Sequence, residues 1–172
     1  MEIWDAYNKD GSLAGIDLIR GKEIPKGLYH GVAEVFVSHI DGSILLMQRD
    51  LNKPNSPGLF ESGAGGSLLK GESFLEGVIR ELKEETGINC TEMRKIYYSI
   101  TDNTIYTGFM CKVDIDKSSI VLQEGETIAY RWVSKKEFLD FYKTDLFVPG
   151  LRNRLSNFID NYLIWDAIEK LE

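Results

Sequence analysis

The chain has 172 residues, 43% of them hydrophobic, and this size suits a single domain built on one core. Its formal net charge of −7 argues against a protein that coats nucleic acid, because such proteins need a basic face to displace counterions. We therefore expect no nucleic-acid polymer as a partner.

A membrane protein is not indicated either. No stretch approaches 18 apolar residues, and residues 1–5 lack the basic and apolar regions of a signal peptide. Cys90 and Cys111 lack the spacing of a metal site and are expected to be reduced thiols that pack as small apolar residues. These features predict a soluble, cytoplasmic protein with no membrane partner.

Turn signals divide the first part of the chain into short strands. Residues 1–28 predict a hairpin that turns at an Asn-Lys-Asp-Gly segment. The β-rich runs 31–38 and 43–48 flank Asp41-Gly42 and predict a second hairpin. A loop rich in Pro, Asn, Ser and Gly follows the second run.

Three ring-bearing residues lie near these strands. His30 begins a strand, and it is either a hydrogen-bonded structural residue or part of a site. His39, beside the Asp-Gly turn, is expected at the surface. Phe60 follows a Pro-Gly pair and is expected to pack in the core rather than to stack on a base.

Residues 66–88 combine a glycine-rich loop with a helix of about four turns. Ser73 and Glu76 form a capping box that begins the helix, and Gly87 is placed to end it. At 100° per residue, the apolar stripe of this helix contains Leu75, Val78, Ile79 and Leu82. Gly77 costs a helix interior about 1 kcal/mol relative to alanine, so it indicates either space for a site or tight packing.

Three glutamates of the same helix, Glu81, Glu84 and Glu85, crowd into the arc beside that stripe. Like charges three or four residues apart repel by about 0.2–0.5 kcal/mol per pair, so the cluster gains only if a cation sits over it. Carboxylate, carbonyl and water oxygens suit hard cations that bridge to substrate phosphates. The pattern therefore predicts Mg²⁺ or Mn²⁺ as cofactor.

The second half of the chain returns to strands and then ends in helices. Further strands are predicted at residues 95–100, 105–113 and 128–133. Residues 134–142 predict a short helix because Ser134 and Glu137 form a second capping box. Residues 151–171 predict a closing helix. Its expected buried side chains are Leu155, Phe158, Ile159, Tyr162 and Leu163. A mixed sheet between helices is the simplest layered arrangement.

The spacing Gly-x5-Glu-x7-Arg-Glu-Leu-x-Glu-Glu-x-Gly-Ile within residues 66–88 resembles the Nudix box. The matching positions are Gly66, Glu72, Arg80, Glu81, Leu82, Glu84, Glu85, Gly87 and Ile88. The resemblance implies one Nudix-type α/β/α sandwich domain with a mixed β-sheet, covering residues 1–172. It also implies a metal-dependent hydrolase that cleaves the diphosphate linkage of a nucleoside diphosphate joined to a group X, or of a related small molecule.

The same resemblance assigns roles to individual residues. Glu81 and Glu85 are expected to be direct metal ligands, and Glu84 is either a third ligand or the group that activates water. The carbonyl of Gly65 is the expected backbone ligand, and Gly66 allows the bend that aims it. The expected catalytic set comprises Glu84, Glu85 and Glu126.

Two more assignments concern support and proton transfer. Glu72 is expected to pair with Arg80 or to orient it, in a supporting role. Related hydrolases often recruit a base from the loop before a late strand, and Glu124 and Glu126 precede residues 128–133. Glu126 is favoured as the base, and the alternative is that both are solvated loop acids.

Motifs outside the box resemble the Nudix subgroup related to isopentenyl diphosphate isomerase. They are Trp4-Asp5, Arg20-Gly21, Gly27-x-Tyr29-His30 and Gln48-Arg49-x3-Lys53-x3-Pro57-Gly58-Leu59-Phe60. In that subgroup the Arg-x3-Lys pair lies near the diphosphate, so Arg49 and Lys53 are expected to bind substrate phosphate oxygens. The alternative is that both are solvated ends of a strand and a loop.

Two other functions compete with hydrolysis. An isomerase of that subgroup uses a cysteine and, two residues later, a metal-binding histidine, but Gly65 and Ser67 occupy those positions here. A non-catalytic nucleotide-binding module usually carries a broken box, whereas this box is intact. The pattern favours a hydrolase acting on a small-molecule diphosphate, and it leaves open X, the number of metal ions and the oligomeric state.

Overall fold

The structure, a computed structural model, describes residues 2–169, and it describes the surroundings of side chains for residues 2–161. Within this region the strands are β1 (Ile3–Tyr7), β2 (Leu13–Ile19), β3 (His30–His39), β4 (Ile44–Arg49), β5 (Phe60–Glu61), β6 (Ala64–Ser67), β7 (Arg94–Ile100), β8 (Thr104–Val113) and β9 (Thr127–Val133). The helices are α1 (Phe74–Thr86), α2 (Lys135–Phe141) and α3 (Pro149–Glu169), with a 3-10 turn at Lys117–Ser119.

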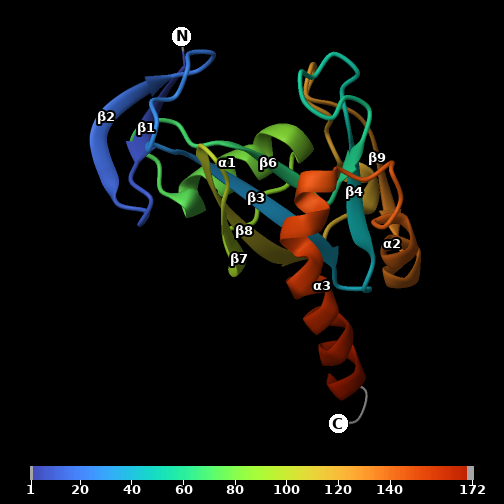
Figure 1. The fold of residues 1–172 in the computed structure, drawn as a ribbon. Coiled ribbons are helices and arrows are strands. Elements are labelled where there is room, and N and C mark those ends of the chain that lie inside the picture. Colours follow the sequence, from blue (N-terminus) through green and yellow to red (C-terminus); the bar gives the residue numbers. More distant parts are fainter. Residues whose placement is uncertain (1, 170–172) are drawn as a thin grey trace.

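A mixed sheet lies between two helical layers. Its strand order is β5-β4-β3-β8-β7, with β6 paired to β3 and β9 paired to β4, and the β3–β8 pair is parallel. Val78 and Leu82 of α1 pack into a core on one face. Phe138 of α2 and Leu155 of α3 pack into a core on the other face, where α3 crosses in front of β3 (Figure 1). The predicted α/β/α sandwich with a mixed sheet is confirmed.

The central strand β3 divides its residues between the two faces, because successive side chains of a strand point to opposite sides. One face packs into the α1 core through Ala33, Val35 and Val37. On the other face Phe36 packs under α2 and α3. Nearer the start of the strand, His30, Val32 and Glu34 of this second face line a cavity, and Arg154 from the first turns of α3 binds Glu34. The site therefore lies beside the start of α3.

The two predicted hairpins have different outcomes. The first is confirmed as β1 and β2, which form a separate two-stranded sheet closed by a turn with Gly11 at φ +85°. The second exists only at its turn, where Ser38 pairs with Ile44. Beyond that pair the strands diverge, because β4 pairs with β9 while β3 pairs with β6 and β8.

Strands β5 and β6 lie in a segment that the sequence analysis assigned to a loop. Its glycines are unfavourable for strands in general, yet here they allow close approach of two backbones. A Cβ on Gly63 would lie 2.2 Å from the carbonyl oxygen of Val35, and the φ of Gly63 is +111°. Register pairs Gly65 with Glu34 and Gly66 with Ala33. Glycine content therefore marks a tightly packed strand instead of a flexible loop.

Helix α1 begins and ends as predicted. The Ser73 hydroxyl oxygen accepts from the Glu76 N–H, the Glu76 carboxylate accepts from the Ser73 N–H, and Gly87 adopts the left-handed cap with φ 76°. The predicted apolar stripe is wrong at Leu75, which is 42% exposed, because Phe74 packs against the core in its place. Ile79 is half-buried, while Val78 and Leu82 are fully buried.

The later elements largely match their predictions. The strands predicted at residues 95–100, 105–113 and 128–133 are β7, β8 and β9. The capping box of α2 is present at Ser134. Helix α3 begins two residues earlier than predicted, at Pro149, and buries Leu155, Phe158 and Ile159 as expected. The side chains of Tyr162 and Leu163 and the predicted end at residue 171 fall outside the described part of the chain.

The remaining single-residue predictions can be compared directly. His39 is buried, so its predicted surface position is wrong, and its Nε2 lies 3.1 Å from the Ile115 carbonyl oxygen. Phe60 packs against the α2–α3 core, as expected. Both cysteines are free thiols, with Cys111 buried and Cys90 half-buried. No helix in the described region is long and apolar enough to cross a membrane.

Gly77 supplies a test of this packing. A Cβ at this position would lie 2.2 Å from Cδ2 of Leu68, so the structure favours tight packing as the reason for glycine. We predict that Gly77→Ala lowers the free energy of unfolding by about 1–3 kcal/mol through overpacking, outweighing the helix propensity gain of about 1 kcal/mol. Denaturant unfolding measures this change, with exposed Leu75→Ala as the control on the same helix. A stabilised Gly77→Ala protein would contradict the packing argument.

Candidate functional site

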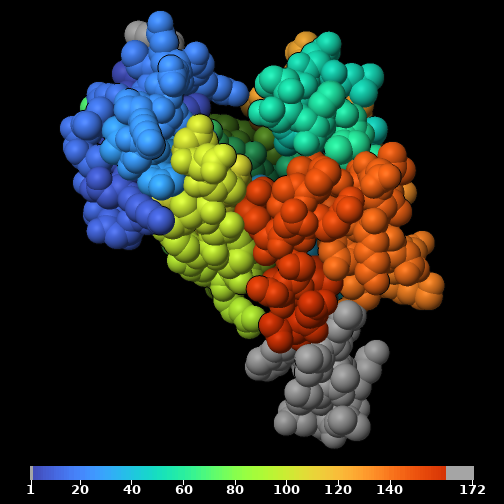
Figure 2. All heavy atoms as spheres, viewed as in Figure 1, coloured from blue at the N-terminus to red at the C-terminus, as the bar shows by residue number. Residues whose placement is uncertain are grey.

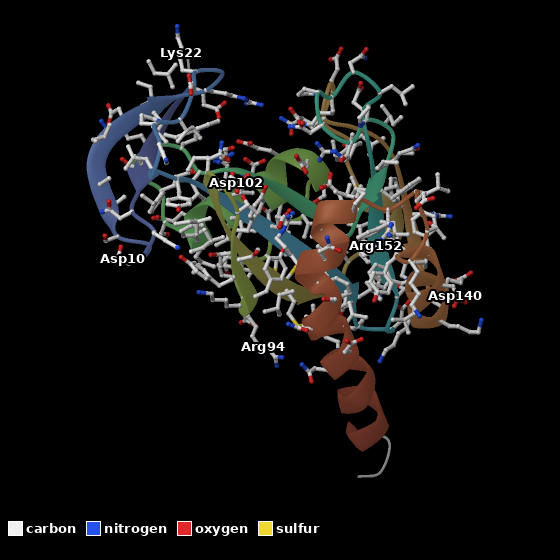
Figure 3. All side chains as sticks on the ribbon, viewed as in Figure 1. Asp10, Lys22, Arg94, Asp102, Asp140 and Arg152 are labelled. Carbon is white, nitrogen blue, oxygen red and sulfur yellow. The ribbon has the colours of Figure 1, made fainter. Side chains whose placement is uncertain are left out.

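A cavity of about 740 Å³ opens between the N-terminal hairpin, the β4–β5 loop, α1 and the start of α3. Figure 2 shows this hollow between the blue hairpin and the teal β4–β5 segment. In Figure 3 the β7–β8 turn, marked by Asp102, lies between the hairpin and α3, and the next two residues, Asn103 and Thr104, line the cavity. Segments far apart in the chain thus meet around one hollow.

The structure brings the sequence-predicted site residues to this cavity. Those that line it are Arg49, Lys53, Gly65, Gly66, Arg80, Glu81, Glu84, Glu85 and Glu126. Glu72 lies behind Arg80 and does not line the cavity itself. Glu124 is exposed and is also not part of the lining, so the structure distinguishes it from Glu126.

Two of the α1 glutamates lie against the backbone of β6. Oε2 of Glu85 lies 3.4 Å from the N–H nitrogen of Gly65. A Cβ on Gly66 would lie 2.3 Å from Oε1 of Glu81, so glycine lets that carboxylate occupy this position. Glu85 is 4% exposed. Burial raises its pKa well above the ordinary value, and the charges of Glu61 and Glu81 raise it further.

Arg80 organises the other carboxylates of the box. Its guanidinium donates to both oxygens of Glu72, over 2.7 and 2.9 Å, and the predicted pairing of these residues is confirmed. It also donates to Glu81 over 2.8 Å and to Glu84 over 3.2 Å. The hydrogen bonds with Glu72 raise the pKa of Arg80 above its ordinary value. Glu72 in turn accepts from the Leu69 N–H over 2.8 Å, which ties the loop to α1.

The donor set near β6 suits a hard divalent cation. Among the described residues, no three Asp, Glu, His or Cys side chains lie close enough together to hold an ion by side chains alone. The carboxylates of Glu81 and Glu85 do both lie against the Gly65–Gly66 backbone, so a cation bound there could combine carboxylate with backbone oxygens. Oxygen donors of this kind are those that Mg²⁺ and Mn²⁺ prefer. A cation here would also offset the buried charge of Glu85.

The two predicted phosphate-binding cations already have carboxylate partners. Arg49 donates from Nη1 to Oε1 of Glu61 over 3.0 Å, and from Nε and Nη2 to the Asn55 carbonyl oxygen over 3.2 and 3.1 Å. Lys53 forms an ion pair with Glu126. Burial lowers the pKa of Lys53, and the positive charge of Arg49 acts in the same direction. Both side chains line the cavity, so they are not simply solvated ends of a strand and a loop.

Glu61, Glu34 and Arg154 line the cavity but were not predicted from the sequence. Glu61 is buried, and burial raises its pKa. Glu34 of β3 binds both Nε and Nη2 of Arg154 from α3, over 2.8 and 2.5 Å. The Arg154 guanidinium also lies 3.8 Å from the ring centroid of Tyr106. No local motif marks these residues, because their contacts join segments up to 120 positions apart.

His30 lies at the hairpin end of the cavity and has structural contacts. Its ring stacks on Trp4, with centroids 4.7 Å apart and planes 18° apart. Its Nδ1 lies 3.2 Å from the Asn103 carbonyl oxygen and 3.3 Å from the Thr104 hydroxyl. Burial lowers its pKa, which favours the neutral ring. These contacts fix the hairpin against β3 and so define one wall of the cavity.

Comparison with known proteins places this geometry in a family context. Residues 28–155 match the NUDIX domain family. The chain is 31% identical over 152 residues to an uncharacterised Nudix hydrolase of Listeria monocytogenes, covering 87% of this chain and 89% of that protein. It is 31% identical over 116 residues to isopentenyl-diphosphate Delta-isomerase of Salmonella heidelberg, covering 63% of this chain and 62% of the isomerase.

Solved structures give the same picture of the fold. DR0079 from Deinococcus radiodurans superposes with a TM-score of 0.72 at 16% identity, over 88% of this chain and 96% of that one. The MutT protein from Methanosarcina mazei Go1 superposes with a TM-score of 0.62 at 26% identity, over 78% of this chain and 95% of that one. The first likeness concerns the fold alone.

The Glu72–Arg80 pair predicts a pH-dependent stability. The Arg80 hydrogen bonds lower the pKa of Glu72, so the pair stabilises the fold above the ordinary glutamate pKa and this contribution is lost as the pH falls through the lowered value. Glu72→Gln should lower the free energy of unfolding by about 1–2 kcal/mol at pH 7, and the difference should shrink in acid. Chemical denaturation of the metal-free proteins across pH measures it. A difference that is constant with pH would contradict the role of the charge.

Proposed function

The chain belongs to the Nudix hydrolase family, and on that premise we propose that it is a metal-dependent hydrolase of a diphosphate linkage in a nucleoside diphosphate-X or a related small molecule. The observation that carries this proposal is the placement of the Glu81 and Glu85 carboxylates against the β6 backbone, on a cavity that also holds Arg49 and Lys53. Acidic and basic groups thus share one cavity, as binding of a metal–diphosphate complex requires.

We propose that Glu81, Glu85 and the carbonyl of Gly65 hold the cation, with Glu84 as a further ligand or as a group that orients water. A bound Mg²⁺ or Mn²⁺ supplies positive charge that neutralises phosphate oxygens and makes water more acidic. Arg80 keeps Glu81 and Glu84 oriented toward the cavity, and Glu72 keeps Arg80 in place. The box therefore contributes both ligands and their support.

Arg49 and Lys53 are the proposed contacts for phosphate oxygens. A guanidinium and an ammonium can each form charge-assisted hydrogen bonds with an anionic oxygen, and such bonds are about twice as strong as neutral ones. The bond of Arg49 to Glu61 holds the guanidinium in position before substrate arrives. Positioned cations reduce the reorganisation that binding would otherwise require.

Glu126 is the proposed general base. It lines the cavity, and its main chain is fixed by the hydrogen bond that its carbonyl oxygen accepts from the Asp50 N–H over 2.9 Å. In the reaction the oxygen of water bonds to one phosphorus while the bond from that phosphorus to the bridging oxygen breaks. Glu126 accepts the water proton, and the bridging oxygen leaves with its electron pair on the released phosphate. Base catalysis of this kind contributes about 10²- to 10⁴-fold.

The isomerase relative does not change this preference. Isomerases of the related subgroup use a cysteine thiol and a histidine imidazole just before the helix that corresponds to α1. This chain has Gly65 and Ser67 at those two positions. Within the described part of the chain, the cavity lining includes neither Cys90 nor Cys111. The intact glutamate set at the cavity supports hydrolysis instead.

The proposed function predicts that turnover needs a divalent cation. A screen of nucleoside triphosphates, nucleotide sugars, dinucleoside polyphosphates, ADP-ribose and isoprenoid diphosphates, with product identification, should reveal phosphate-containing products when Mg²⁺ is present. Excess chelator should abolish turnover and added Mg²⁺ should restore it, because the protein is acidic and Arg49 and Lys53 already have carboxylate partners. Full turnover in a protein shown by metal analysis to be metal-free would contradict the proposal.

A further inference from the structure

The ion pair between Lys53 and Glu126 joins two residues that the proposed function uses for different tasks. Lys53 comes from the β4–β5 loop and Glu126 from the turn before β9, and both line the cavity. While they hold each other, neither charge is free for its own task. This contact is therefore a property of the protein before the diphosphate binds.

The main chain places the two side chains together through one residue. The Asp50 N–H donates to the Glu126 carbonyl oxygen over 2.9 Å, and the Asp50 carbonyl oxygen accepts from the Lys53 N–H over 3.2 Å. On the strand side, Arg49 pairs in register with Thr127, the neighbour of Glu126. Both loops are thus anchored at Asp50, and only the side chains need to move for the pair to separate.

The pair is placed for exchange with an anion. The Lys53 side chain is 16% exposed and that of Glu126 is 30% exposed, so water still reaches the carboxylate. An ion pair that water reaches is held more weakly than a fully buried one, because water screens the attraction. A diphosphate offers several anionic oxygens in place of one carboxylate, and lysine reaches them on a flexible stem. The ammonium can therefore transfer from Glu126 to phosphate at small cost.

The neighbouring cations are held more firmly. Arg49 has a carboxylate partner and two bonds to one carbonyl oxygen, and Arg154 grips both oxygens of Glu34. Within the described residues, the Lys53 ammonium pairs with Glu126 alone, and the charges of Glu85 and Glu61 also attract it. Lys53 is thus the cation of this wall best suited to change partner.

We propose that the Lys53–Glu126 ion pair is a lock on the catalytic base that the substrate diphosphate opens. This inference rests on the proposed function. In the free protein Lys53 positions Glu126 and occupies its carboxylate. The incoming diphosphate takes the ammonium of Lys53, and the carboxylate of Glu126 is released to accept a proton from water. Substrate binding and release of the base thus occur in one event, and Lys53 takes part in both by exchanging its partner.

The lock makes an unusual prediction for binding. If the diphosphate competes with Glu126 for Lys53, removing the competing carboxylate should tighten binding while slowing the reaction. Calorimetric titration with methylenediphosphonate and Mg²⁺ measures binding alone, because the methylene bridge is not hydrolysed. We expect Glu126→Gln to bind it about two- to fivefold more tightly than the parent, the range that an ion pair of this exposure allows. At saturating substrate, kcat of Glu126→Gln should fall at least about 100-fold.

A double-mutant cycle distinguishes the exchange of Lys53 between Glu126 and the diphosphate from a general effect of removing negative charge. Lys53→Met should weaken binding of methylenediphosphonate, and adding Glu126→Gln to that variant should bring no gain, because no ammonium is left to release. A mere loss of negative charge near the cavity would tighten binding equally in both backgrounds, and that result would overturn the lock. Glu124→Gln removes an exposed charge from the same turn and serves as the matched control. Lys53→Arg should retain measurable exchange.

The outcomes distinguish the lock from the function on which it rests. Unchanged or weaker binding by a folded Glu126→Gln protein, with denaturant unfolding as the check, would overturn the exchange. An unchanged kcat would overturn the release of a base. If the parent hydrolyses none of the screened diphosphates and the cycle still shows Lys53-dependent tightening, the hydrolase proposal fails while the exchange itself is supported.

Discussion

The close approach of β6 to α1 is the constraint on which the rest of the site depends. The carboxylate of Glu81 occupies the space where a side chain at residue 66 would be, and the N–H of Gly65 faces Glu85. Gly63 brings the chain equally close to β3, where a Cβ would meet a carbonyl oxygen. A side chain at residue 66 would displace the Glu81 carboxylate, and one at residue 63 would collide with the backbone of β3. Glycine therefore determines the geometry of the acidic groups.

Charge compensation is the second principle of the cavity. Burial and the charge of Glu34 raise the pKa of Glu61, while burial and the charges of Glu61 and Glu81 raise that of Glu85. Cations are paired with most of these carboxylates. Arg80 serves the box, Arg49 serves Glu61 and Arg154 serves Glu34. Glu85 is the exception, because its carboxylate has only a long contact of 3.4 Å with the Gly65 N–H within the described region. A buried carboxylate with so little compensation is costly unless a cation joins it.

Local chemistry explains which features could be predicted from sequence. The caps of α1 and α2 involve residues three apart, and the box spacing lies within one helix and its loop, so both are visible in a short window. The course of β3 is not, because its neighbours β6 and β8 come from distant segments and draw it away from β4. Phe74 replaces Leu75 in the core for the same reason, since the direction in which α1 faces depends on the sheet beneath it.

The candidate site likewise combines local features, which the sequence shows, with contacts between distant segments, which it does not. The residues of the box were identified from their spacing, whereas Glu61, Glu34 and Arg154 meet only through tertiary packing. The sequence placed Lys53 and Glu126 near the substrate, but nothing in it indicated that they contact each other across 73 positions. Contacts of this kind determine how charges are shared, and they can be found only once the fold is known.

The most direct test of the account is a titration of the protein with Mn²⁺, comparing the parent with Glu85→Gln. The substitution keeps the size of the side chain and removes a buried charge, so the fold should survive, which circular dichroism can check. The account predicts that the parent binds Mn²⁺ and that Glu85→Gln binds it at least about tenfold more weakly. Exposed Glu92→Gln should bind like the parent. Equal affinity of the parent and a folded Glu85→Gln protein would contradict the claim that the buried glutamate of α1 holds the metal.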